Sequence, residues 1–135
     1  MSQMSDFLEV ALIKHLFRTG SYAKPTDLLV ALYTVTPSDA GGGTEVGGGK
    51  GYARVSVPPL DANWNATSGT DGHTDNVAAI TFGAPTADWG QVVAIAILDE
   101  GANFLFWGPI TPAKTINNGD PAPSFAIGAL DVTLA

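Results

Sequence analysis

The chain has two histidines, and they lie in different sequence surroundings. His73 belongs to the segment Asp71-Gly72-His73-Thr74-Asp75, in which two carboxylates flank the ring. Such oxygen and nitrogen ligands can hold a metal ion weakly, although clusters of this kind are more often solvated turns. His15 lies among apolar residues, a setting typical of a packed, hydrogen-bonded histidine. We therefore predict no metal ion and no acid–base centre at either histidine.

Two other segments resemble binding loops without meeting their requirements. In the glycine-rich run 41–51, Thr44 stands where a phosphate-binding loop has its first glycine, and Gly51 replaces the hydroxyl residue after the lysine. The segment 61–66 begins like a calcium loop, but Ala66 takes the place of the turn glycine and no glutamate closes the loop. A nucleophile motif of the G-x-S-x-G type is also missing. We predict ordinary loops here, no cofactor and no enzymatic activity.

Three tryptophans offer a different kind of candidate site. Trp64, Trp89 and Trp107 each stand near glycine, asparagine or aspartate in turn-like surroundings. Amphipathic rings at the ends of a sheet can anchor a partner. They can equally pack at the rim of the protein's own core. We include the three as candidate interface residues and leave both interpretations open.

Composition excludes several classes of partner. The chain has 135 residues, 45% of them hydrophobic and only 14% charged, with a net charge of −7. Phosphate binding requires clustered lysine and arginine, so we expect neither nucleic acid nor an anionic membrane surface as a partner. There is no cysteine, and charged residues interrupt the apolar N-terminal stretch, unlike a signal peptide. We predict one soluble domain over residues 1–135. Because it has few charged residues, we expect it to bury apolar surface against a partner.

A helix is predicted over residues 5–19. Ser5 can cap its start, and acidic residues follow in the first turn. One face is apolar at three- and four-residue spacing, and Val10, Ile13 and Phe17 form a second apolar face. Such a helix is buried on two sides, either within its own fold or against another subunit. Val10, Ile13 and Phe17 are therefore candidate assembly residues.

Beyond Pro25 the pattern changes to short strands separated by glycine and proline. We predict a long loop over 63–76 and no regular element in the glycine-rich run 41–51. Strands are predicted over 27–36, 52–57, 77–82, 91–99, 104–108, 114–116, 123–127 and 130–134. One helix followed by these strands indicates a mainly β fold, a β-sandwich over about 27–135 or a partly closed barrel.

Several stretches in chain order also carry a resemblance to a known family. They are SDFLE (5–9) with Leu12 and HLF (15–17), LVALYT (29–34), TPSD (36–39), the glycine-rich run with GYARV (51–55), ITFGAP (80–85) with Trp89-Gly90, Trp107-Gly108, KTIN (114–117), Gly119-Asp120, PSF (123–125) and LDVTL (130–134). This pattern resembles small virion proteins of tailed bacteriophages, described as tail fibre-like or minor structural proteins. The resemblance implies a structural protein of the virion, made in the host cytoplasm.

Location on the virion is a further hypothesis. Our first hypothesis is a capsid decoration (cement) protein on the capsid exterior, which binds the major capsid protein and copies of itself, as a trimer. Low charge and a helix with two apolar faces suit such assembly, and contacts made only in the shell would stabilise it. The alternative is a tail, neck or fibre-associated protein. A second alternative is a surface carbohydrate-binding module that uses the tryptophans.

Overall fold

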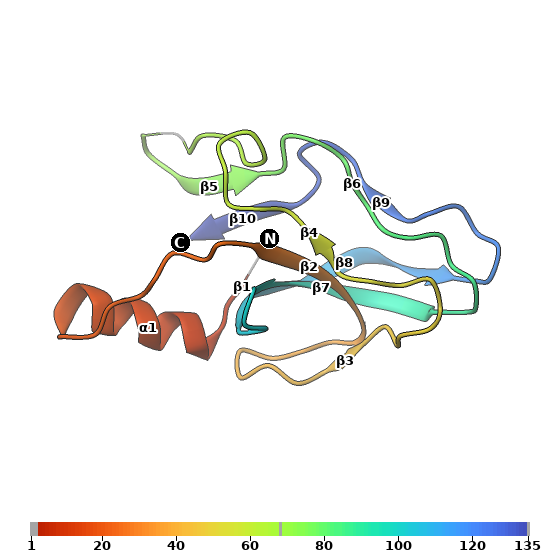
Figure 1. Cartoon of the computed structure of the whole chain (residues 1–135), viewed down its shortest axis with the longest axis horizontal. Helices are drawn as coiled ribbons and strands as arrows, with labels where there is room; N and C mark the ends of the chain where they lie inside the picture. Colours follow the sequence, from red (N-terminus) through yellow and green to blue (C-terminus); the bar gives the residue numbers. More distant parts are fainter. Residues whose placement is uncertain (1–2, 68, 135) are drawn as a thin grey trace.

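The computed structural model describes residues 3–67 and 69–134. Its elements are β1 (Gln3–Met4), α1 (Asp6–Phe17), β2 (Leu28–Val35), β3 (Thr44–Glu45), β4 (Val55–Ser56), β5 (Gly72–Asp75), β6 (Ile80–Thr81), β7 (Gly90–Asp99), β8 (Phe104–Ile116), β9 (Ser124–Phe125) and β10 (Asp131–Leu134). The fold is mainly β, with antiparallel sheets and an N-terminal helix, and it is sandwich-like and not a closed barrel (Figure 1). Among the described residues, no helix is long and apolar enough to cross a membrane.

The main sheet is built around β7. Its strand order is β1-β8-β7-β2-β3, and β4 also pairs with β2. The apolar run from Val92 to Leu98 has β2 on one side and β8 on the other, as expected for a central strand covered on both faces. Alternate side chains of this run point to opposite faces, so the sheet has two apolar faces to cover.

Two small β-ladders and their loops cover one face of the main sheet. β5 pairs with β10, and β6 pairs with β9 (Figure 1). The core between the layers includes Val30, Leu32, Phe82 and Trp89, all at most 3% exposed. Trp89 also donates from Nε1 to the backbone oxygen of Lys50 at 2.7 Å. This hydrogen bond fixes the end of the glycine-rich run to the core.

α1 lies on the opposite side of the main sheet from these two ladders (Figure 1). The sheet face on this side carries Ala31, Ala94 and Ala96, each at most 1% exposed, which pack with Tyr33 and Leu98. Ser5 caps α1 by accepting the backbone N–H of Leu8 at 3.2 Å, and Leu8 is the buried residue of the helix. α1 is thus anchored to the sheet by its first turn.

The mainly β fold, the helix and the central strand are confirmed, but several boundaries predicted from the sequence are wrong. Strands 104–108 and 114–116 are one strand, β8. Pro109 and Pro112 do not break it, because beyond Trp107 its paired neighbour in the described structure is β7 alone, and proline is tolerated at a sheet edge. The predicted loop 63–76 contains β5, and the glycine-rich run contains β3. Both short strands carry polar residues and gain their order from pairing, β5 with the distant strand β10 and β3 with the preceding strand β2.

Candidate functional site

The helix α1 presents different side chains on opposite sides. Leu8 is 5% exposed against the sheet, with Ala11 half-buried on the same side. Val10, Ile13 and Phe17 are 51%, 54% and 77% exposed. With 3.6 residues per turn these three side chains form a row on the side away from the sheet. We call Val10, Ile13 and Phe17 the helix stripe.

The anchoring of α1 leaves its second half uncovered. The backbone N–H groups of Ser5 and Asp6 donate to the carbonyls of Leu105 and Asp39 at 2.9 and 2.8 Å, so the start of the helix is fixed. From Ile13 onward every residue of the helix is exposed. Of the two interpretations of the second apolar face, burial within the chain's own fold is therefore excluded for the helix stripe. An uncovered row of large apolar side chains is typical of an interaction surface.

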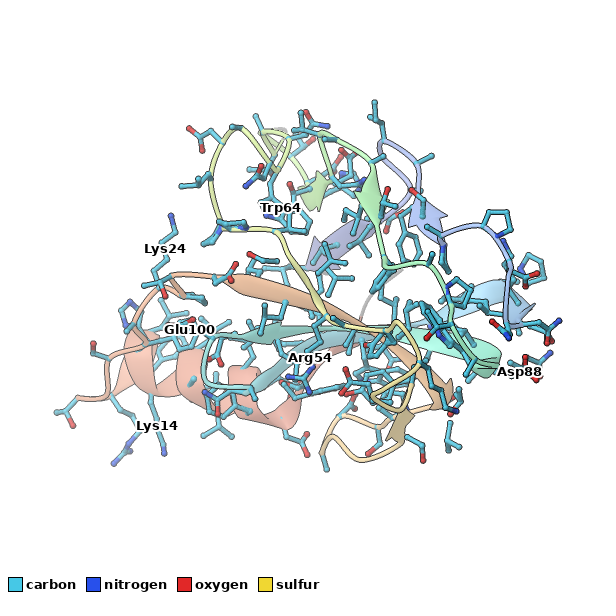
Figure 2. All side chains as sticks on the ribbon, turned by 45° about the vertical axis from the view of Figure 1, so that its right-hand side comes forward. Lys14, Lys24, Arg54, Trp64, Asp88 and Glu100 are labelled. Carbon is cyan, nitrogen blue, oxygen red and sulfur yellow. The ribbon has the colours of Figure 1, made fainter. Side chains whose placement is uncertain are left out.

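Charged residues flank the helix stripe. At 3.6 residues per turn, Glu9 falls on one side of the row and Lys14 on the other. Figure 2 shows the Lys14 side chain extending away from the sheet. The row therefore has an acidic neighbour and a basic neighbour, and Leu16, 67% exposed on the side of Glu9, extends the apolar surface.

A groove lies on the other face of the main sheet, at the end where β10 approaches β2. Its volume is about 800 Å³. Its apolar lining consists of Leu28, Leu60, Trp64, Ile97, Phe106 and Val132. Ile97 and Val132 are buried, whereas Leu60 is 58% exposed at the rim. We call this cavity the apolar groove. Its size lies within the range of ligand-binding clefts.

Few free polar groups face the apolar groove. Trp64 donates from Nε1 to the carbonyl of Val57 at 3.4 Å, and Thr74 donates its hydroxyl to the carbonyl of Asn65 at 2.7 Å. The Asn65 side-chain amide donates to Asp75. Lys24 and Asp61 contribute the charged groups of the lining. Lys24 extends from the segment before β2, on the side of the sheet where Trp64 lies (Figure 2).

The structure separates the three tryptophans. Trp64 lies in the apolar groove, Trp89 is 3% exposed in the core, and Trp107 is half-buried on the α1 side of the sheet. Trp107 donates from Nε1 to Asp39 Oδ1 at 2.9 Å. Within this chain, Trp89 has almost no surface to offer a partner, and its packing against Tyr52 accounts for its burial. Trp64, in the lining of the apolar groove, remains accessible to a partner.

A half-buried hydrogen-bonded group that the sequence does not reveal joins the glycine-rich run to the core. Tyr52 donates its hydroxyl to Glu45 Oε1 at 2.7 Å, and Arg54 makes a bidentate ion pair with Glu45 at 2.9 and 2.8 Å. Burial raises the pKa of Glu45, but hydrogen bonds from Arg54 and Tyr52 outweigh it and hold that pKa below its usual value. Burial also raises the pKa of Tyr52. Every group here is paired, so we assign this cluster a structural role.

The remaining motifs have structural positions. His15 Nδ1 accepts the backbone N–H of Tyr22 at 3.1 Å, which joins the helix to the following segment. His73 lies in β5 opposite Thr133 of β10. The described residues contain no group of three or more potential ligands placed to hold a metal ion. In the glycine-rich run, Gly51 has a φ of +76° and contacts the backbone of Ala84 too closely for any side chain.

One comparison with known proteins identifies a family. Residues 3–133 match the family model described as podophage GP4 fiber I protein gp80. No curated protein matches the chain. Because the match covers nearly the whole chain, the protein belongs to this family of tailed-phage virion structural proteins. The resemblance stated from the sequence is confirmed.

Proposed function

We propose that this member of the podophage fibre family is a structural component of the tail or tail fibre, which acts by assembly and not by catalysis. The observation that carries the proposal is the family match over residues 3–133, because its description names a fibre protein. Our first hypothesis from the sequence, capsid decoration, receives no support from this match. The fibre-associated alternative fits it better.

The helix stripe supports a role in assembly. Val10, Ile13 and Phe17 place three large apolar side chains in water in the isolated chain, although half of the helix is already anchored. Covering such side chains contributes roughly 25 cal/mol for each Å² removed from water. A free monomer gains no stability from these exposed side chains, whereas an assembly that buries them is stabilised.

Copy number and position in purified virions test the proposed location. We expect quantitative mass spectrometry to give a copy number that is a small fraction of that of the major capsid protein. Gold-labelled antibodies should bind at the tail in electron micrographs. A copy number close to that of the shell subunit, with label over the capsid, would instead support decoration. Absence from purified virions would contradict both locations.

Ile13→Asp tests the helix stripe as an assembly surface. Ile13 is 54% exposed, so an aspartate there leaves the fold intact while it places a charge in the apolar row. We expect this variant to be missing from particles when it replaces the wild type in infected cells. Ile127→Asp is the matched control, because Ile127 is 70% exposed and lies outside α1. Normal incorporation of a folded Ile13→Asp variant would refute the role of the helix stripe.

A further inference from the structure

We infer that the helix stripe of one copy docks in the apolar groove of a second copy of this chain. The inference rests on the proposed function in one respect, since it takes the helix stripe to be an assembly surface. It adds the identity of the partner and the site on it that receives the stripe. The chain thus carries both halves of one contact.

A single copy cannot make this contact with itself. The groove lies on the sheet face that carries Leu28, Ile97 and Phe106, which pack into the core between the layers. α1 is anchored at β8, where the Ser5 hydroxyl donates to the carbonyl of Phe104. Figure 1 shows α1 and the β5–β10 ladder on opposite sides of the main sheet. The helix stripe and the groove can therefore meet only between molecules.

The apolar groove has the size and depth to receive the helix stripe. A cavity of about 150 Å³ accommodates a benzene ring. A groove of about 800 Å³ therefore has room for the Phe17 ring together with the Val10 and Ile13 side chains. The groove floor is buried and apolar at Ile97 and Val132. An inserted apolar row would meet a surface of the same kind there.

The charges around the two surfaces allow an oriented contact. Glu9 and Lys14 border the helix stripe, and Lys24 and Asp61 line the groove. A net charge of −7 makes two copies repel each other at long range, so a contact between copies needs opposite charges at close range. Glu9 beside Lys24, with Lys14 beside Asp61, would supply them. Such pairing selects one orientation and contributes little to affinity.

The groove favours an apolar segment over a sugar. A saccharide needs several free donors and acceptors to replace its bonds to water. The Trp64 indole, the Asn65 amide nitrogen and the Thr74 hydroxyl each already donate a hydrogen bond within the chain. The charged side chains of the lining, Lys24 and Asp61, are exposed. A second copy supplies apolar side chains, which need no such partners.

Complementation between two variants tests the contact. Ile13→Asp removes the helix stripe and keeps the groove, and Leu60→Asp places a carboxylate at the groove rim and keeps the stripe. In sedimentation velocity we expect the wild type to associate as its concentration rises and each variant to remain monomeric. An equal mixture should restore a complex no larger than a dimer, because each pair retains one intact stripe and one intact groove. Ile127→Asp, the control, should associate like the wild type.

The possible failures are distinguishable. If folded Leu60→Asp associates like the wild type, or the mixture stays monomeric, the groove does not receive the stripe and the inference is overturned. If the wild type is monomeric at every concentration while Ile13→Asp is excluded from particles, the stripe binds another virion protein. The proposed function then stands and this inference falls. Circular dichroism and a cooperative urea transition show that each variant is folded.

Discussion

Individual residues of the glycine-rich run determine how it joins the core. Gly51 adopts a φ of +76°, a conformation that costs other residues roughly 1–2 kcal/mol. A Cβ at this position would lie 2.1 Å from the carbonyl oxygen of Ala84, which backbone geometry does not permit. Lys50, next to it, accepts hydrogen bonds from Trp89 and from the backbone of Thr86. The end of the glycine-rich run is thus held in one conformation against the core, although its composition alone predicts only a loop.

Gly51→Ala should therefore destabilise the protein by about 2 kcal/mol or more, since strain and overlap act together. Urea unfolding followed by fluorescence measures the change in the free energy of unfolding. Gly48→Ala is the control, because no atom lies within 4 Å of the Cβ added there. Equal effects of the two substitutions would show that the fit at Ala84 does not matter.

Glu45 should make stability depend on pH. Its folded-state pKa lies below the ordinary 4.5, because Arg54 and Tyr52 hydrogen-bond to the carboxylate. The stabilisation is present in full above the unfolded-state pKa and is lost as pH falls through the lower folded-state pKa. We expect Glu45→Gln to cost about 1–2 kcal/mol at neutral pH and much less below the folded-state pKa. Urea titrations of both proteins across this range provide the measurement, and a constant difference at all pH values would contradict it.

At the scale of elements, the cap decides where the helix stripe is held. Ser5 is 1% exposed, accepts the N–H of Leu8 and donates its hydroxyl to the carbonyl of Phe104. One side chain thus ends the pairing of β1, begins α1 and ties both to β8. The remaining turns of α1 have few contacts with the sheet, so this junction sets the direction of the helix.

Ser5→Ala should lower the free energy of unfolding by about 1–2 kcal/mol, the upper part of the range for a lost N-cap. The reason is that removal of the hydroxyl also leaves the carbonyl of Phe104 without this donor. Thermal unfolding followed by circular dichroism measures this loss. Thr19→Ala, at the exposed residue after the helix, serves as the control and should leave stability unchanged. A similar midpoint for all three proteins would mean that Ser5 does not anchor α1.

The elements that the sequence predicts well are those whose own side chains determine them. The apolar run 92–98 predicts a central strand, which is confirmed. The second apolar face of 5–19 leaves open whether the fold or a partner covers it, and the structure leaves it exposed. β5 and β3 are polar and short, so only their pairing with β10 and β2 orders them. The apolar groove combines residues from distant segments, among them Leu28, Trp64 and Val132. No local pattern predicts such a cavity, and the sequence offers Trp64 only as one of three candidate interface residues.

At the scale of the whole molecule, the described residues form the helix stripe on one side of the main sheet and the apolar groove on the other. A surface that fits a different surface of the same protein can repeat from copy to copy, giving rings, filaments or reciprocal dimers. The net charge of −7 opposes non-specific association. Assembly from copy to copy therefore depends on the specific contact between the helix stripe and the apolar groove. This combination suits a protein that must stay soluble until it assembles.

Occupation of the groove can be followed with a dye that fluoresces on exposed apolar surface. In an associated wild type the groove is filled by a neighbouring helix stripe, so dye binding should fall as protein concentration rises. Ile13→Asp removes the occupant and leaves the groove open, and its dye fluorescence per molecule should stay high at all concentrations. Leu60→Asp should bind less dye than Ile13→Asp, because its groove carries an added carboxylate. If wild type and Ile13→Asp bind the dye equally at high concentration, the groove is not where the stripe is covered, and the two apolar surfaces must serve different partners.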